Sequence, residues 1–111
     1  MGTELSRGGL DRMIFTPAER VANGIRFLNR LRKSKRWQKR IDLKTFNINA
    51  QCDCTLGQLF GTYAEGCLKL QLKEHSEEAK QLGFMPIEAE MGEYDADAKA
   101  LNREWRKQLA K

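Results

Sequence analysis

The chain has 111 residues and a mass of 12.8 kDa, which is room for a single domain. Hydrophobic residues make up 41% of it and charged residues 32%, a balance that fits a modest core under a well-solvated surface. No apolar run approaches the roughly 20 residues that span a bilayer, and no early stretch resembles a secretory signal. We therefore expect a cytoplasmic protein without a membrane partner.

The net charge of +5 is distributed unevenly along the chain. Residues 1–45 hold twelve Lys and Arg against four Asp and Glu, a net charge of +8, whereas residues 46–111 hold eight against eleven, a net charge of -3. This asymmetry indicates either an anionic partner or one half of the fold facing the other.

We predict residues 1–15 as a disordered tail and residues 16–111 as one helical domain. Thr16-Pro17-Ala18-Glu19 has the form of a capping box with proline at the first helical position. An apolar stripe with helical spacing follows: Val21, Ile25, Leu28 and Leu31. A first helix is expected to run to about Ser34, with an extension through Trp37 left open.

Residues 41–48 begin with the alternation of a strand, but Leu43 and Phe46 also fit one helical turn. No other segment shows a convincing strand pattern, so a strand here would lack a partner. We predict an extended or short-helical connector whose apolar side chains fill the core.

The clearest helical pattern lies in the middle of the chain, with Asp53 or Thr55 as the expected N-cap. Apolar residues then recur over four turns: Leu56, Leu59, Phe60, Tyr63, Cys67 and Leu70. Gly57 and Gly61 lie four residues apart on the adjoining face, where another helix could approach closely. We expect one continuous central helix.

Three further features follow in the second half of the chain. Ser76 is expected to cap a short helix that ends at Gly83, and an acidic linker covers residues 88–93. A last helix is expected after Asp95 or Asp97. It should bury Ala98, Leu101, Trp105 and Leu109 and carry Lys99, Arg103, Arg106 and Lys107 on its other faces. The fold class is thus all-α, a small single-domain bundle of three to four helices.

The stretch Arg26–Arg40 contains no acidic residue and forms the main basic patch. Such cations neutralise phosphates, and an exposed Trp37 would stack on a base. The candidate nucleic-acid- or polyanion-binding residues are Arg30, Arg32, Lys33, Lys35, Arg36, Trp37, Lys39 and Arg40. The alternative is a solvated helix face that runs into a basic turn, with Trp37 in the core. Because no helix-turn-helix, zinc-finger or RNP pattern is present, sequence-specific reading of DNA is not predicted.

Cys52, Cys54, Cys67 and His75 have the residue types of a zinc site. However, the C-x-C spacing is tighter than usual, and Cys67 falls within the apolar stripe. We interpret the cysteines as reduced and expect no metal and no cofactor, with a zinc-stabilised module as the minor alternative.

Catalytic residues are not indicated by the sequence. His75 is the one histidine, and no nucleophile motif surrounds any serine or cysteine, so we do not expect an enzyme. The stripe around Trp105 is interpreted as core packing in preference to a partner-binding surface.

The segment from Cys54 to Tyr63 reads CTLGQLFGTY. It resembles the C-x-L-G-Q-L-aromatic-G-x-Y motif of a family of small uncharacterised proteins of actinobacteria and their bacteriophages. Segments near Trp37–Ile48, Leu82–Phe84 and Leu101–Arg106 are similar to further landmarks of that family, so the likeness covers about residues 37–109. The chain departs from the family in its more basic Arg26–Arg40 stretch. The resemblance implies a compact helical phage or prophage accessory protein and no known activity.

Together these observations predict a non-enzymatic accessory protein, encoded by a phage or prophage and acting in the host cell cytoplasm. Its expected partner is a host or viral macromolecule, with a protein as the first choice. The alternative is nucleic-acid binding through the Arg26–Arg40 patch. The oligomeric state is left open.

Overall fold

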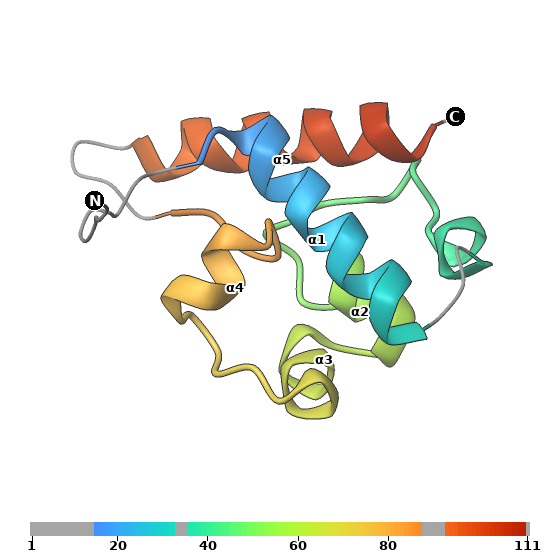
Figure 1. The fold of residues 1–111 in the computed structure, drawn as a ribbon. Helices are drawn as coiled ribbons and strands as arrows, with labels where there is room; N and C mark the ends of the chain where they lie inside the picture. The colour runs from blue at the N-terminus through green and yellow to red at the C-terminus, as the bar shows by residue number, and fades with distance from the viewer. Residues whose placement is uncertain (1–14, 33–35, 88–92, 111) are drawn as a thin grey trace, which may run out of the picture.

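The computed structural model describes residues 15–32, 36–87 and 93–110. This part of the chain contains five α-helices, one 3₁₀ helix and no strand. The all-α prediction is confirmed, with one helix more than expected. The expected tail up to residue 14, residues 33–35 and most of the acidic linker (88–92) lie outside this part. Helix α5 runs along one side of the molecule and α1 packs across it, while α2, α3 and α4 lie on the other side of α1 (Figure 1).

Helix α1 spans Pro17–Arg32 and begins with the expected capping box. The backbone N–H of Glu19 donates to the Thr16 hydroxyl at 3.1 Å, and the Glu19 carboxylate accepts from the Thr16 N–H at 2.9 Å. The expected apolar stripe is correct except at Leu31, whose side chain is 51% exposed. A residue three positions after Leu28 is rotated by about 60° around the helix, and at the end of α1 that rotation turns it out of the core. The 3₁₀ helix η1 follows at Arg36–Arg40.

The predicted continuous central helix is wrong, because the chain forms two helices at this place. Helix α2 spans Thr55–Phe60 and α3 spans Tyr63–Leu70. Gly61 between them has φ 107°, a backbone conformation that glycine adopts without a steric penalty. Thr62 then starts a new helix, since its hydroxyl accepts from the Glu65 N–H at 3.0 Å. The apolar spacing continues across this corner, so periodicity alone did not reveal the break.

The start of α2 also differs from expectation. Its N-cap is Cys54, whose thiol sulfur accepts from the Gly57 N–H at 3.3 Å, and neither Asp53 nor Thr55 has this role. Gly57 does admit a close neighbour, but that neighbour is the preceding loop, not another helix. A Cβ atom at Gly57 would lie 2.2 Å from the Gln51 carbonyl oxygen.

Helix α4 (Glu77–Gln81) begins at the predicted cap. The Ser76 hydroxyl accepts from the Ala79 N–H at 3.2 Å. Gly83, with φ 72°, follows the C-cap Leu82 and turns the chain so that Phe84 enters the core. The sequence predicted both the cap and the turn correctly.

Helix α5 spans Glu93–Leu109, so it begins before both expected N-caps, Asp95 and Asp97. Asp97 instead lies inside the helix, where its side chain binds Arg20 of α1. The predicted inner face is confirmed, since Ala98, Leu101, Trp105 and Leu109 are all buried. None of the helices in the described part is long and apolar enough to cross a membrane.

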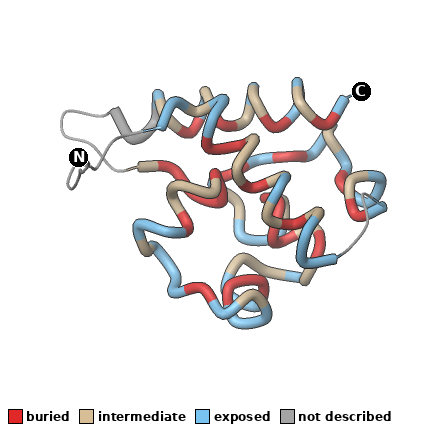
Figure 2. Tube along the Cα trace, in the orientation of Figure 1, coloured by how far each residue is buried: buried red, intermediate tan, exposed pale blue. Residues whose placement is uncertain are grey.

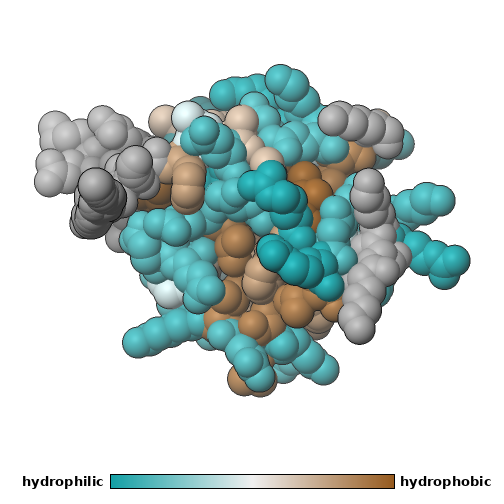
Figure 3. All heavy atoms as spheres, in the orientation of Figure 1, coloured by the Kyte–Doolittle hydropathy of each residue, from teal (hydrophilic) through white to brown (hydrophobic). Residues whose placement is uncertain are grey.

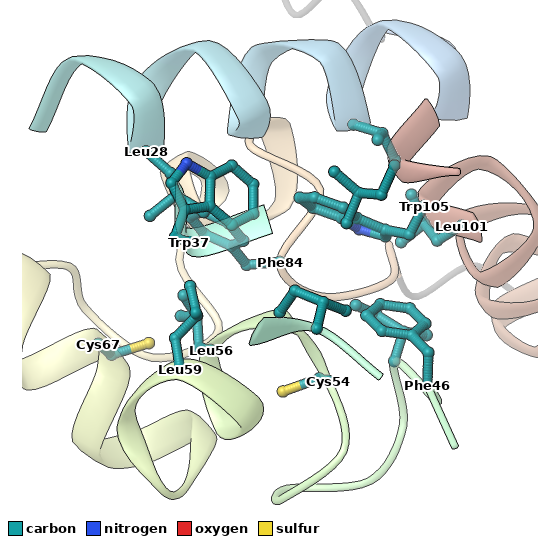
Figure 4. Close-up of a cluster of buried hydrophobic side chains, with 14 of the residues drawn as sticks. Leu28, Trp37, Phe46, Cys54, Leu56, Leu59, Cys67, Phe84, Leu101 and Trp105 are labelled. Atoms are coloured by element: carbon teal, nitrogen blue, oxygen red, sulfur yellow. The ribbon is translucent and has the colours of Figure 1, made fainter. Parts of the chain in front are cut away.

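The core lies between α1, α5, the inner sides of α2 and α3, and the loops around the short helices (Figure 2). Trp105 is at its centre, stacked on Phe84 with ring centroids 6.2 Å apart and tilted against Phe46 at 6.1 Å (Figure 4). The Trp105 indole N–H donates to the Gly83 carbonyl at 2.7 Å. Ile41, Phe46 and Ile48 are buried in the turns of 41–48, which confirms the predicted connector.

Candidate functional site

The end of α1 and η1 lie at one end of the molecule, which we call the basic end (Figure 1). We define it by the cations Arg30, Arg32, Arg36, Lys39 and Arg40. All five side chains are exposed. Hydrophilic side chains project from this end in the space-filling view (Figure 3). The predicted Lys33 and Lys35 lie outside the described residues. Arg26, also exposed, hydrogen-bonds the Asn23 side chain.

Asn29 explains why the two groups of cations come together. Its side-chain oxygen accepts from the Trp37 indole N–H at 2.8 Å and from the Gln38 amide at 3.3 Å. These bonds fix η1 against α1, and the direction of η1 then brings its basic side chains to the end of the longer helix. The Asn29 hydrogen bonds therefore hold the first residues of η1 beside the last turns of α1.

Trp37 itself is 2% exposed and belongs to the core, with its indole packed among buried side chains (Figure 4). The expectation that it offers an exposed ring to a nucleic-acid base is wrong, and the alternative interpretation of a core tryptophan is correct. A large aromatic ring is a strong hydrophobic anchor, and its one polar atom is satisfied by Asn29. Trp37 thus positions the basic end and is not itself a contact residue.

Two neighbouring residues at the end of α1, Leu31 and Arg32, are in different surroundings. The Arg32 guanidinium carbon lies 5.6 Å from the centroid of the Phe60 ring, a cation–π contact that ties the end of α1 to α2. Leu31, between two exposed arginines, is 51% exposed.

The cysteines and His75 are not arranged as a metal site in the described part of the chain. Cys52 and His75 are exposed, Cys54 and Cys67 are buried, and no three His, Cys, Asp or Glu side chains there lie close enough together to hold a metal ion. Burial raises the pKa of the Cys54 thiol and of the Cys67 thiol, so both stay protonated. Cys54 caps α2, and Cys67 fills the core.

A half-open cleft of about 230 Å³ lies beside α3, between the loop before α2 and the chain around Met85. Tyr63, Glu74 and His75 line its polar part. Burial raises the pKa of Tyr63, and its hydroxyl accepts from the His75 backbone N–H at 3.1 Å. The phenol is therefore neutral and holds the loop before α4 in place. The volume is below that of typical small-molecule sites.

Comparison with protein-family models, with curated proteins and with solved structures finds no match to this chain. The likeness of the Cys54–Tyr63 motif to the actinobacterial and phage family therefore stays a prediction. The geometry does give this motif a physical role, since Cys54 caps α2, Gly57 admits the Gln51 carbonyl and Gly61 makes the corner. Gln58 adds a fourth role by donating to the Asp42 and Asp53 carbonyls at 3.1 and 2.9 Å.

Proposed function

We propose that this chain is a non-enzymatic accessory protein that binds an acidic surface of another protein through its basic end. The observation that carries this proposal is Leu31, half exposed between the exposed Arg30 and Arg32. An apolar anchor gains free energy when it is buried by a partner, and surrounding arginines supply charged hydrogen bonds at the rim.

The same geometry favours a protein over nucleic acid at this end. Phosphate oxygens offer Leu31 no apolar contact, and Trp37 offers no ring to a base because it is buried. Hydrophobic side chains also gather on the face shown in Figure 3, beside the end of α1. Such a surface with a charged border is typical of a protein-binding site.

The resemblance described above extends the proposal to the biological setting. A phage or prophage protein of this size would act in the cytoplasm of an actinobacterial host, on a host or viral protein. The bacterial lysate is therefore the first source in which to search for the partner.

The experiment compares Leu31→Ser with Leu68→Ser, because Leu68 on α3 is 72% exposed and provides a matched control. Tagged wild-type protein and both variants are used to capture proteins from an actinobacterial lysate treated with nuclease. We expect an acidic protein that Leu68→Ser retains and that Leu31→Ser recovers about 10- to 30-fold less, the range for loss of one central apolar anchor.

A second variant, Arg30→Gln/Lys39→Gln/Arg40→Gln, tests the charges. It should reduce capture and make the remaining capture less sensitive to salt. Equal recovery by the wild type and both basic-end variants would overturn the proposal. Capture from a parallel untreated lysate that is absent from the nuclease-treated one would instead favour the alternative, nucleic-acid binding through Arg26–Arg40.

A further inference from the structure

The cleft beside α3 has a different chemistry from the basic end, and none of its lining residues belongs to that end. Its apolar walls come from three separate segments: the loop before α2, the start of α3 and the chain that follows α4. They are formed by Ile48, Ala50, Cys54, Tyr63, Ala64, Phe84, Met85 and Pro86. A concave space with mostly apolar walls and a few polar groups is the usual form of a small-molecule site.

The volume of the cleft, about 230 Å³, limits the size of what it can hold. This is below the ~300 Å³ at which sites for drug-sized ligands begin, but above the roughly 150 Å³ that encloses a benzene ring. In proportion, the cleft holds about nine non-hydrogen atoms, which is the size of a small bicyclic ring. Because the cleft is half open, a short substituent on that ring can extend to its mouth.

The deep part of the cleft suits a flat apolar ring. Phe84 and Met85 line it although they are only 1% and 5% exposed, so they lie at its base. The Phe84 ring is held from behind by its stacking on Trp105. Aromatic rings bury a large apolar area, and a methionine sulfur makes favourable contacts with them. A ring that enters the cleft therefore meets a fixed aromatic wall beside an adaptable one.

Tyr63 and His75 fix the rim of the cleft on the side of α3. The Tyr63 hydroxyl accepts from the His75 backbone N–H at 3.1 Å, and the two side-chain rings lie 5.7 Å apart. His75 has φ 60°, a left-handed conformation that is uncommon outside glycine. Its contacts with Tyr63 hold it in that conformation, so the rim has its shape before a ligand binds.

Glu74 gives the mouth of the cleft a negative charge. Its carboxylate is exposed and makes no hydrogen bond or ion pair with the described residues. Burial is the largest cause of the raised pKa values of the Tyr63 phenol and the Cys67 thiol, and the negative charge of Glu74 raises both further. Lys73, its neighbour in the chain, does not line the cleft, and the described lining residues include no other lysine and no arginine.

These features together select one class of ligand. The apolar walls favour an uncharged ring, and the volume limits that ring to about nine atoms. The unpaired carboxylate at the mouth attracts a positively charged substituent and repels a negative one, which disfavours phosphorylated compounds and carboxylic acids. An ammonium group at the rim also gains a cation–π contact, which the Tyr63 ring is placed to supply.

We propose that the cleft binds a small organic amine, with its apolar ring against Phe84 and Met85 and its ammonium group at Glu74. The inference goes beyond the proposed protein partner and does not depend on it, because Leu31 and the cations of the basic end take no part in the cleft.

The experiment compares three compounds that share an indole ring and differ in charge: tryptamine is a cation, tryptophol is neutral and indole-3-acetate is an anion. Each is titrated into the full chain near neutral pH, and the backbone amides are followed by NMR. A compound of this size should bind with a Kd on the order of 1 mM and shift the amides of Ala64, His75 and Met85. We expect tryptophol to bind about 2- to 5-fold more weakly than tryptamine, the range for one ion pair at an exposed carboxylate, and indole-3-acetate more weakly still.

Two variants test the charge and the volume separately. Glu74→Gln should remove the preference for tryptamine over tryptophol. Glu78→Gln is the matched control, since it removes another exposed carboxylate that does not line the cleft, and it should keep the preference of the wild type. Ala64→Leu places a larger side chain in the cleft and should weaken the binding of all three compounds at least about fivefold. Because Glu74 and Ala64 are both exposed, these variants should keep the fold, which the same NMR spectra check.

Leu31→Ser separates this site from the basic end and should leave tryptamine binding unchanged. Weaker binding in that variant would place the amine at the basic end and overturn the proposal. Equal affinity of the wild type for the three compounds, an unchanged preference in Glu74→Gln, or binding that Ala64→Leu does not weaken would overturn it as well.

Discussion

The two halves of α1 use the same residue type in opposite ways. Arg20, in the first half, is 1% exposed and binds Asp97 as well as the Lys80 carbonyl at 2.9 Å and the Met85 carbonyl at 3.4 Å. Arg30, in the second half, is exposed at the basic end. The first arginine joins α1 to α4, to α5 and to the loop after α4, whereas the second presents its charge to solvent. The role of a cation in this protein is therefore set by what packs against its turn of the helix.

The largest effect should come from the buried arginine. Arg20→Gln removes the partner of Asp97 and leaves that carboxylate with the Ile87 N–H as its remaining donor, at 2.7 Å. Breaking a buried ion pair from one side typically costs about 3–5 kcal/mol of unfolding free energy. Urea denaturation measures the change. Arg30→Gln is the control, and we expect its effect to stay within about 0.5 kcal/mol. Equal effects of the two variants would remove the distinction between the halves.

The same ion pair makes the stability depend on pH. Burial raises the pKa of Asp97, but the hydrogen bonds from Arg20 and from the Ile87 N–H, with the positive charge of Arg20, outweigh it and hold the pKa below its ordinary value of 3.8. Because the folded state binds this proton less readily, the stabilisation is complete above about pH 4 and is lost as the pH falls through the lower folded value. Denaturation at a series of pH values should show this loss in the wild type and a smaller one in Asp97→Asn.

A smaller effect is expected where α1 meets α2. Arg32→Gln removes the cation over the Phe60 ring, which at an exposed site is worth about 0.5–1 kcal/mol. A double-mutant cycle with Phe60→Leu measures the coupling between the two side chains. A coupling near zero would mean that Arg32 is as independent of the fold as Arg30.

The cysteines allow the same comparison between exposed and buried side chains of one residue type, and we expect its test to leave the stability of the protein almost unchanged. Cys52 is exposed, whereas burial raises the pKa of Cys54 and of Cys67 and keeps them as unreactive thiols. Iodoacetamide should therefore label Cys52 alone in the folded protein and all three cysteines in urea, as counted by mass spectrometry. Labelling of Cys67 at the rate of Cys52 would contradict the buried position.

Much of the fold could be predicted because local signals and the core agreed. The capping box at Thr16 and the cap at Ser76 form their hydrogen bonds with residues nearby in the sequence. The inner face around Trp105 is buried, as its helical spacing predicts. The corner at Gly61 could not be predicted in the same way, since the apolar stripe on its two sides keeps a helical period. Only the φ of Gly61 and the cap at Thr62 distinguish two helices from one.

The candidate site was predicted less completely. Charge along the chain located the basic end, but the burial of Trp37 depends on Asn29, eight residues away, and on the core behind it. The partner of Asp97 is 77 residues away, so no local pattern identified it as an internal helix residue.

The corner between α2 and α3 also affects the order in which the protein folds. Isolated helices shorter than about 12–15 residues are marginal in water. The six residues of α2, the eight of α3 and the five of α4 fall below that length, whereas the 16 of α1 and the 17 of α5 exceed it. The short helices must therefore acquire their structure from the surface that α1 and α5 make together. We expect hydrogen exchange to protect the amides of α1 and α5 first during refolding, and those of α2 and α3 only once these two helices have docked.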